Sequence, residues 1–254
     1  MILVLAGTLD GRELAVRLAN AGYQVIVSVI SDYGRSLAES PGLSVYAGQL
    51  TIADMQEMID AQGIKAIIDA SHPYAVNGST NAMAACEATG IKYIRYERSA
   101  VSVPDEYEGL YLAGDAGEAA KIAAGLGQVI FLTTGSRTLK LFKYEPLLAK
   151  CRIIARVLPQ PEVISECIEL GFSPGDIVAI QGPFSHKFNA AMFKEYAAEV
   201  VITKNSGTIG GADTKISAAM ELGLPIIVIG RPAIVYKNLC LTHEEVINMV
   251  LEVI

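Results

Sequence analysis

A glycine turn follows the first apolar run of the chain and is the first candidate for chemistry. A glycine turn that leads from a strand into a helix exposes backbone N–H groups at the helix N-terminus, an arrangement that suits a phosphate. The turn departs from the GxGxxG fingerprint, because Leu9 and Arg12 stand where its second and third glycines would be. An ordinary tight turn therefore explains the segment about as well as a cofactor site. The candidate cofactor-binding residues here are Gly7, Thr8, Asp10, Gly11 and Arg12.

The second apolar run ends in Ser31, Asp32 and Arg35, which could hold the ribose end of a dinucleotide. An acid after the second strand commonly binds the ribose hydroxyls of NAD, whereas a basic residue accommodates the 2′-phosphate of NADP. Ser31 and Arg35 suit that phosphate, and Asp32 suits the hydroxyls. We favour NADPH, with NADH as the alternative. A solvated helix residue is nearly as good an interpretation of Arg35.

A polar and aromatic cluster, Ser71, His72 and Tyr74, follows the fourth apolar run, and Pro73 within it fixes the loop. A lone histidine is more often structural than catalytic, but a position after a central strand favours catalysis. His72 or Tyr74 is therefore a candidate to orient a cofactor or to donate a proton. We expect Ser71 to contact the cofactor.

Polar or cationic residues follow every expected strand of the second half except the one that ends at Val157. They suggest an anion-binding surface. Helix capping by serine and threonine is the alternative interpretation. Capping does not explain why four cations occur together, namely Arg137, Lys204, Lys215 and Arg231. The candidate substrate-binding residues are Ser136, Arg137, Gln181, Ser185, Lys204, Asn205, Ser206, Lys215 and Arg231.

These residues need a scaffold of alternating strands and helices. We expect strands, apolar on both faces, at residues 2–6, 24–30, 43–46, 66–69, 92–95, 110–113, 129–133, 152–157, 177–180, 200–203 and 226–229. We expect helices at residues 12–21, 52–62, 75–89, 116–126, 139–148, 162–170, 187–196, 214–222 and 243–253. Repeated βα units of this kind predict an α/β fold with parallel sheets and right-handed crossovers.

The alternation breaks after residue 95, which divides the chain. We expect an N-terminal nucleotide-binding domain at residues 1–97, a connector at 98–127 and a C-terminal substrate domain at 128–254. The connector contains Pro104 and several acids, with a candidate strand and helix of its own. The final helix is a candidate to pack back on the first domain.

Composition narrows the class of protein. With 254 residues, 52% of them hydrophobic, the chain can bury a large core, and no apolar run is long enough for a membrane span. The net charge of −7 disfavours nucleic acid as a partner. Four widely spaced cysteines and three unclustered histidines predict a reduced, cytoplasmic protein with no metal site. The oligomeric state is not predicted.

The order of these motifs along the chain resembles the precorrin-6A reductase family of corrin (cobalamin) biosynthesis, called cobalt-precorrin-6A reductase in the anaerobic route. The matching blocks are Gly7-Thr8 with Asp10-Gly11-Arg12, Asp69 to Ala75, Thr134 to Arg137, Gln181 to Ser185, Thr203 to Gly207, Lys215 and Arg231-Pro232. Ala6 stands where the family favours a second glycine.

The resemblance implies an α/β protein with two Rossmann-like parallel-sheet domains flanking a cleft. It further implies a pyridine nucleotide held by the first domain and a carboxylate-rich corrin precursor as partner, one ring double bond of which is reduced by hydride transfer. A reductase of another small anion on the same scaffold, and a non-catalytic NADPH-binding module, are the alternatives.

Overall fold

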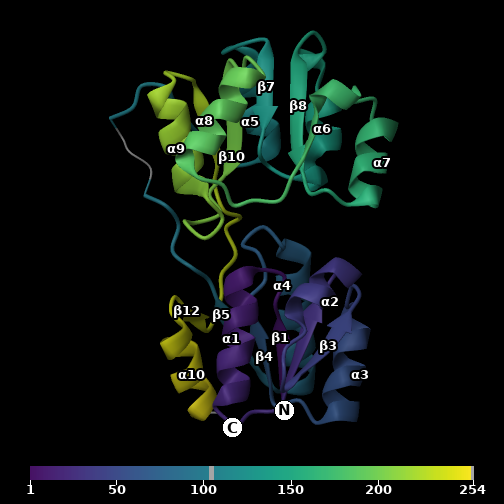
Figure 1. Ribbon diagram of the computed structural model, residues 1–254. Helices are drawn as coiled ribbons and strands as arrows, with labels where there is room; N and C mark the ends of the chain where they lie inside the picture. Colours follow the sequence, from purple (N-terminus) through teal and green to yellow (C-terminus); the bar gives the residue numbers. More distant parts are fainter. Residues whose placement is uncertain (103–105, 253–254) are drawn as a thin grey trace. The chain divides into compact units, whose positions relative to one another are not determined.

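The computed structural model describes residues 1–102 and 106–252 and forms two compact units (Figure 1). The first unit contains Met1–Ser99 and the described part of Ala233–Ile254, and the second contains the described part of Ala100–Pro232. Pro104 of the expected connector and Val253 at the expected end of the last helix lie outside the described residues.

The first unit is a parallel six-stranded sheet in the order β12-β5-β4-β1-β2-β3. Its strands are β1 (Ile2–Leu5), β2 (Val25–Val29), β3 (Leu43–Ala47), β4 (Ala66–Asp69), β5 (Lys92–Tyr96) and β12 (Leu239–Cys240). Its helices are α1 (Leu9–Asn20), α2 (Asp32–Ala38), α3 (Ile52–Gln62), α4 (Val76–Thr89) and α10 (His243–Leu251).

Helices cover both faces of this sheet, which is why its strands are apolar on both sides. Leu14 and Leu18 of α1 pack with Val246 and Val250 of α10 in one core cluster. Residues of α3 and α4 form a second cluster that contains Met55. Each βα unit thus buries one helix face against the sheet.

The second unit repeats this architecture, with the parallel strand order β6-β11-β10-β7-β8-β9. Its strands are β6 (Leu110–Ala113), β7 (Val129–Leu132), β8 (Arg152–Val157), β9 (Ile177–Ala179), β10 (Val200–Lys204) and β11 (Ile226–Ile229). Its α-helices are α5 (Ala116–Ala124), α6 (Leu139–Tyr144), α7 (Pro161–Glu169), α8 (His186–Glu195) and α9 (Ala212–Glu221), with short 3₁₀ turns at Ser136–Thr138, Pro146–Leu148 and Pro174–Asp176.

Both sheets have the strand order of a Rossmann fold, and in each the sixth strand pairs with a strand that is far from it along the chain. In the first sheet β12, which follows β11 of the second unit along the chain, occupies the edge beside β5. In the second sheet β6, which follows β5, occupies the edge beside β11. Residues 110–124 of the expected connector therefore supply β6 and α5 to the second unit.

The expected strands and helices are present, with three instructive differences. The first helix begins at Leu9 rather than Arg12, because Thr8 caps it. The helix expected at residues 139–148, α6, ends at Tyr144. A 3₁₀ turn starts at Pro146, which cannot continue a helix. The prediction missed α2 and β12, since α2 buries only Ala38 and β12 has two residues.

Candidate functional site

The turn after β1 and the loop after β4 meet in the first unit. β1 and β4 are neighbours at the centre of the sheet. From β1 the chain continues to β2 on one side, and from β4 it continues to β5 on the other side. Ligands of open α/β sheets bind at such a switch point. The Thr8 hydroxyl donates to the Ala70 carbonyl oxygen at 3.1 Å and joins the two strand exits. The structure thus brings the predicted Gly7–Arg12 and Ser71–Tyr74 groups to one edge.

The local geometry of this turn fits a phosphate. Gly7 is exposed, and Thr8 caps α1 by accepting the Gly11 N–H at 3.2 Å. A Cβ on Gly11 would lie 2.8 Å from the Ala70 carbonyl oxygen, so glycine allows α1 to approach the exit of β4. Close helix–strand packing is what the last glycine of a dinucleotide fingerprint provides. Gly11 therefore allows the close helix–strand packing that the fingerprint assigns to a glycine at the position of Arg12.

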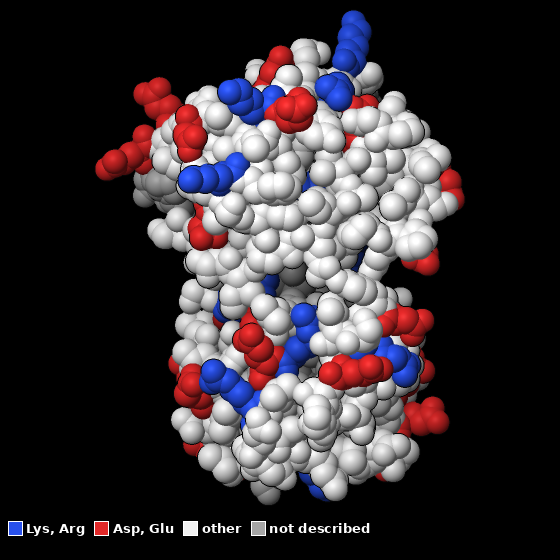
Figure 2. Space-filling model, viewed as in Figure 1, with Lys and Arg blue, Asp and Glu red and all other residues white. Residues whose placement is uncertain are grey.

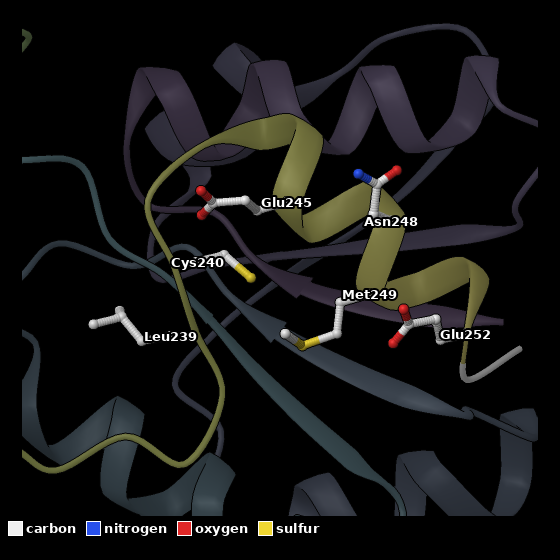
Figure 3. A pocket seen from close by; sticks show the side chains of 6 residues that line it. All are labelled: Leu239, Cys240, Glu245, Asn248, Met249 and Glu252. Atoms are coloured by element: carbon white, nitrogen blue, oxygen red, sulfur yellow. The ribbon is translucent and has the colours of Figure 1, made fainter.

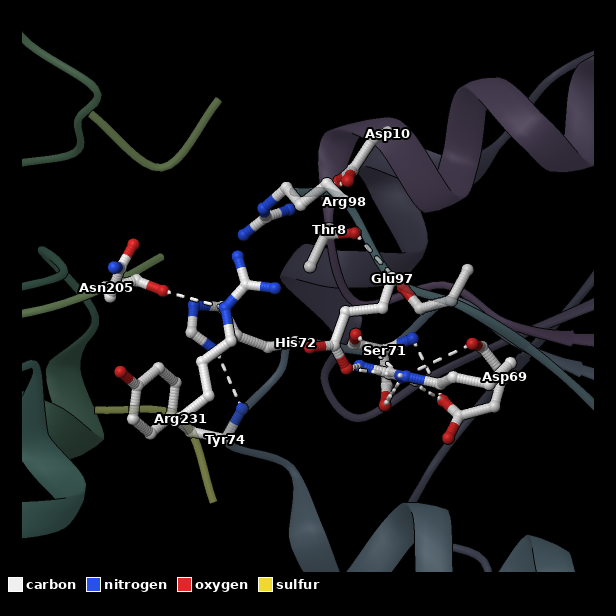
Figure 4. A network of polar contacts seen from close by, with 12 residues as sticks. Thr8, Asp10, Asp69, Ser71, His72, Tyr74, Glu97, Arg98, Asn205 and Arg231 are labelled. Carbon is white, nitrogen blue, oxygen red and sulfur yellow. Dashed lines mark hydrogen bonds and ion pairs between the residues drawn. The ribbon is translucent and has the colours of Figure 1, made fainter. Parts of the chain in front are cut away.

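Asp10, a predicted cofactor ligand, is paired with Arg98. One guanidinium nitrogen of Arg98 donates to both carboxylate oxygens of Asp10 at 2.8 Å, and both side chains are buried (Figure 4). Burial opposes the charge of Asp10, but the neighbouring Thr8 side chain and the charge and hydrogen bonds of Arg98 together outweigh burial and hold the pKa of Asp10 below the usual value. Arg98 thus neutralises an acid at the N-terminus of α1 that would otherwise repel a phosphate. The sequence analysis missed Arg98.

The exit of β2 presents the residues predicted to recognise the ribose end. Ser31 caps α2 by accepting the Gly34 N–H at 3.1 Å. Arg35 and Asp32 are both exposed, and their ion pair is loose, at 3.7 Å. Because water screens such a pair, Arg35 is available to an incoming anion.

A buried ionic network lies beneath the Ser71–Tyr74 loop. Arg95 Nη1 lies 2.9 Å from Asp69 Oδ1, and Arg95 Nη2 lies 3.0 Å from Glu97 Oε2. Tyr93 donates its hydroxyl to Asp69 at 2.8 Å. Burial disfavours the charge of Arg95, but Asp69, Tyr236 and Glu97 together outweigh burial and keep its pKa above the ordinary value.

This network corrects the expectation that residues 92–95 form a strand apolar on both faces. Arg95 is fully buried, and it also donates to the Ser71 carbonyl oxygen at 3.2 Å and to the Ser71 hydroxyl at 3.3 Å. The arginine near the end of this strand was the signal that sequence reasoning passed over.

His72 and Tyr74 form a compact pair within one turn. The Tyr74 N–H donates to His72 Nδ1 at 3.3 Å, and the ring centroids lie 5.5 Å apart (Figure 4). Because Nδ1 accepts this bond, the proton of the neutral imidazole lies on Nε2. The ring is thereby prepared to donate a hydrogen bond from Nε2.

The second unit has a corresponding switch point between β7 and β10. Lys204, at the end of β10, donates from Nζ to the Thr134 carbonyl oxygen at 2.8 Å. Burial, reinforced by the neighbouring charge of Arg137, lowers the pKa of Lys204 to about 8. Arg137 itself is exposed, in a 3₁₀ turn that begins at Ser136. The structure therefore gathers three of the predicted substrate-binding residues here.

Several other predicted residues have structural partners. The Asn205 amide both accepts from the Val101 N–H at 2.9 Å and donates to the Val101 carbonyl oxygen at 3.1 Å. Arg231 donates from Nε to the Asn205 carbonyl oxygen at 3.0 Å (Figure 4). Ser185 caps α8. Ser206 is buried, and its hydroxyl lies so close to Gly210 that a Cβ there would clash with it. Gln181 is exposed in the loop after β9.

Lys215, another predicted substrate-binding residue, is buried. It lies in the first turn of α9, is only 6% exposed, and donates from Nζ to the Gly210 carbonyl oxygen at 3.0 Å. Burial, reinforced by Arg156, lowers its pKa to about 7. Arg156, the penultimate residue of β8, is a further cation that sequence reasoning missed, because only the residues after each strand were considered.

The charge on one face of the surface (Figure 2) and one surface hollow do not point to a different anion site. On the face shown in Figure 2, Lys and Arg are interspersed with Asp and Glu. An open hollow beside α10 is lined by Leu239, Cys240, Glu245, Asn248, Met249 and Glu252 (Figure 3). Its two carboxylates do not suit an anionic ligand, and the Leu241 N–H donates to Glu245. Among the described residues, no group of three His, Cys, Asp or Glu could hold a metal, and no helix is long and apolar enough to cross a membrane.

Two Rossmann sheets, each with polar groups gathered at its switch point, define a two-domain Rossmann-like α/β protein. The family model described as "Precorrin-6x reductase CbiJ/CobK" matches residues 1–251. The chain belongs to this family, whose members are oxidoreductases of cobalamin biosynthesis that act on a CH–CH group by NAD(P)H-dependent hydride reduction.

Named relatives agree with the family match. A cobalt-precorrin-6A reductase of Priestia megaterium is 44% identical over 98% of this chain and 97% of its own. The cobalt-precorrin-6A reductase of Salmonella typhimurium is 40% identical over 91% of this chain and 87% of its own. The solved structure titled "CobK precorrin-6A reductase" is 28% identical, covers 99% of this chain and 96% of its own, and superposes with a TM-score of 0.79.

Proposed function

We propose that this chain is the NADPH-dependent reductase of cobalt-precorrin-6A and forms the corresponding 6B product. The observation that carries the proposal is the family match over residues 1–251, joined to relatives of 38–44% identity that are named cobalt-precorrin-6A reductases. Relatives named precorrin-6A reductases are 30–32% identical, which favours the cobalt-containing substrate over the metal-free one.

The first unit has the features that a dinucleotide requires. Exposed Gly7 and the capped N-terminus of α1 would hold the pyrophosphate, and Gly11 brings that helix close to the sheet. Ser31 and exposed Arg35 at the exit of β2 would hold a 2′-phosphate, which favours NADPH over NADH. When bound, the reduced nicotinamide supplies the hydride.

His72 is the residue that we assign to proton delivery. Reduction of a carbon–carbon double bond adds one hydride and one proton, so the protein must supply or conduct that proton. His72 presents Nε2–H, and Tyr74 positions the ring through its backbone N–H and its side chain. Arg95 holds Ser71 from below and fixes where this loop leaves β4.

The second unit supplies cations for a carboxylate-rich substrate. Arg137 and Lys204 lie at its switch point, Arg231 follows β11, and Lys215 lies in the first turn of α9. Arginine binds a carboxylate in a fixed, bidentate geometry, so these residues would orient the macrocycle as well as attract it.

The four unpaired cysteines fit a cytoplasmic location.

Oxidation of NADPH by the purified chain, followed at 340 nm with cobalt-precorrin-6A, tests the proposal. We expect stoichiometric NADPH oxidation and a shift in the absorption spectrum of the macrocycle. Parallel reactions with metal-free precorrin-6A and with NADH rank the two substrates and the two cofactors. NADPH binding without oxidation in the presence of either precursor would instead identify a non-catalytic binding module.

A further inference from the structure

Among the described residues of the second unit, the buried Lys215 and the partly buried Arg156 lie close enough for their charges to interact, and neither is in an ion pair. Arg156 is the penultimate residue of β8, Lys215 is the fourth residue of α9, and α8 packs against α9 (Figure 1). We call Arg156, Phe184, Asn189, Thr214 and Lys215 the Arg156–Lys215 cluster. Every member lies near the carboxyl end of the sheet, the edge at which open α/β sheets bind ligands.

The guanidinium of Arg156 is held from two sides. Its Nη1 donates to the Asn189 side-chain oxygen at 2.9 Å, and its Cζ lies 5.2 Å from the centroid of the Phe184 ring. Asn189 is fully buried, and its amide nitrogen donates to the carbonyl oxygens of Phe184 and Ser185 and to the Thr214 hydroxyl. These three acceptors fix the amide so that its oxygen faces Arg156. The fork of Arg156 is therefore oriented before any ligand arrives.

Lys215 brings a second positive charge to the same place. Its ammonium has three N–H donors, and the Gly210 carbonyl oxygen takes one of them. The residue lies in the first turn of α9, where the helix dipole favours an anion rather than a cation. Both the burial and the position of Lys215 are thus unfavourable in the absence of a negative partner.

The other two buried cations of the described residues, Arg95 and Arg98, are each paired with an acid. Arg95 is paired with Asp69 and Glu97, and Arg98 is paired with Asp10. Within the described part of the chain, by contrast, neither Arg156 nor Lys215 forms an ion pair. Asp213 stabilises the charge of Lys215 less than Arg156 opposes it, and burial also lowers the pKa of Arg156 to about 10. Uncompensated buried charge of one sign is typical of ligand sites.

We propose that Arg156 and Lys215 form a subsite for one carboxylate of the corrin precursor, with Arg156 binding it bidentately and Lys215 adding a second charged hydrogen bond. This inference rests on the proposed function and adds Arg156, Asn189 and a specific anchoring point to it. Asn189 and Phe184 act as positioning residues, since they hold the guanidinium and do not carry charge.

Equilibrium binding of cobalt-precorrin-6A, followed by absorbance titration without cofactor, tests the subsite in four proteins. These are the wild type, Lys215→Met, Arg156→Lys and, as a matched control, Lys194→Met on the exposed face of α8. Met removes the charge of Lys215 at similar volume, and Lys keeps the charge at position 156 but removes the fork. NADPH titration and the thermal melting temperature are measured on the same samples.

We expect Lys215→Met and Arg156→Lys each to weaken corrin binding about tenfold or more, as loss of a charge-assisted hydrogen bond does. NADPH affinity and the control should stay within about twofold of the wild type, and Lys215→Met should melt no lower than the wild type. If Arg156→Lys binds the corrin precursor within about twofold of the wild type, the proposed subsite is wrong. The subsite is also wrong if NADPH affinity falls by as much as corrin affinity does.

If Lys215→Met fails to fold, Arg156→Lys decides the question alone, because it retains the buried charge. If the wild type binds the corrin precursor but does not oxidise NADPH, the proposed reduction fails while the binding titration still decides the subsite.

Discussion

Arg95 Nη1 lies 2.9 Å from Asp69 Oδ1, and neither side chain is exposed to solvent. The pair joins β4 to its neighbour β5 directly below the loop that carries Ser71 and His72. The same guanidinium donates to the backbone and the side chain of Ser71. The position of the candidate proton donor therefore depends on a charge pair inside the sheet.

Replacement of Arg95 tests this dependence. Arg95→Met leaves the Asp69 carboxylate buried without its partner, so we expect the free energy of unfolding to fall by about 3–5 kcal/mol. Urea denaturation followed by circular dichroism measures the loss. Arg17→Ala, which breaks the exposed pair with Glu244, should cost less than about 1 kcal/mol. Equal losses in the two variants would show that the buried network contributes no more to the free energy of unfolding than an exposed ion pair does.

His72→Ala should lower kcat by about a hundredfold or more while the melting temperature and the NADPH dissociation constant stay close to wild type, because only proton delivery is lost. Tyr74→Phe keeps the ring and the backbone N–H that positions His72, so it should lose far less. Asn77→Ala, an exposed change in the following helix, is the control. An unchanged steady-state rate in His72→Ala removes this residue from the mechanism.

Arg35→Ala should raise the NADPH dissociation constant about tenfold and change that of NADH by less than about twofold, since only NADPH carries the 2′-phosphate. Fluorescence titration of each reduced nucleotide measures both values. The exposed position of Arg35 and its loose pair with Asp32 make a folding defect an improbable cause of any loss. Equal weakening for both nucleotides contradicts the assignment.

The lowered pKa of Lys215 predicts a pH-dependent stability. Its pKa is about 7 in the folded chain against an ordinary value of 10.5, because burial and Arg156 oppose its charge more than Asp213 supports it. Between these values the unfolded chain binds the proton and the folded chain does not. The wild type should therefore gain stability as the pH rises from 7 towards 10, by up to about 1.4 kcal/mol per pH unit from this group.

Lys215→Met lacks this group, so its stability relative to the wild type should decline steadily across the same pH range. Urea denaturation at pH 7, 8, 9 and 10 on both proteins gives the comparison, and Lys194→Met supplies the reference for an exposed lysine. A stability difference that does not change with pH would mean that Lys215 keeps its proton in the folded chain.

Local sequence was enough to predict the βα rhythm and the strand exits, because parallel strands covered on both faces are short continuous apolar runs. It also brought Gly7–Thr8 and Ser71–His72 to attention, since both groups directly follow such runs. It could not reveal that Gly11 rather than residue 12 provides the close helix contact, which depends on the Ala70 backbone far along the chain.

The missed residues share one physical property: their roles depend on partners distant in sequence. Arg95 became interpretable only when Asp69 lay beside it in the sheet, and Arg98 only when it reached Asp10. Arg156 lies within a strand rather than after one, and its uncompensated charge is visible only when its surroundings are known. The edge strand β12 has two residues and is recognisable only by its pairing with β5.

The origin of β12 has a consequence for biosynthesis on the ribosome. The first sheet lacks its outermost strand, and the Val246 and Val250 side chains that pack against α1, until the last part of the chain has been translated. The whole second unit is synthesised in that interval. In the nascent chain β5 is therefore an unpaired edge strand until β12 has been translated. A gene truncated between the two units would encode a first half in which β5 has no β12 to pair with.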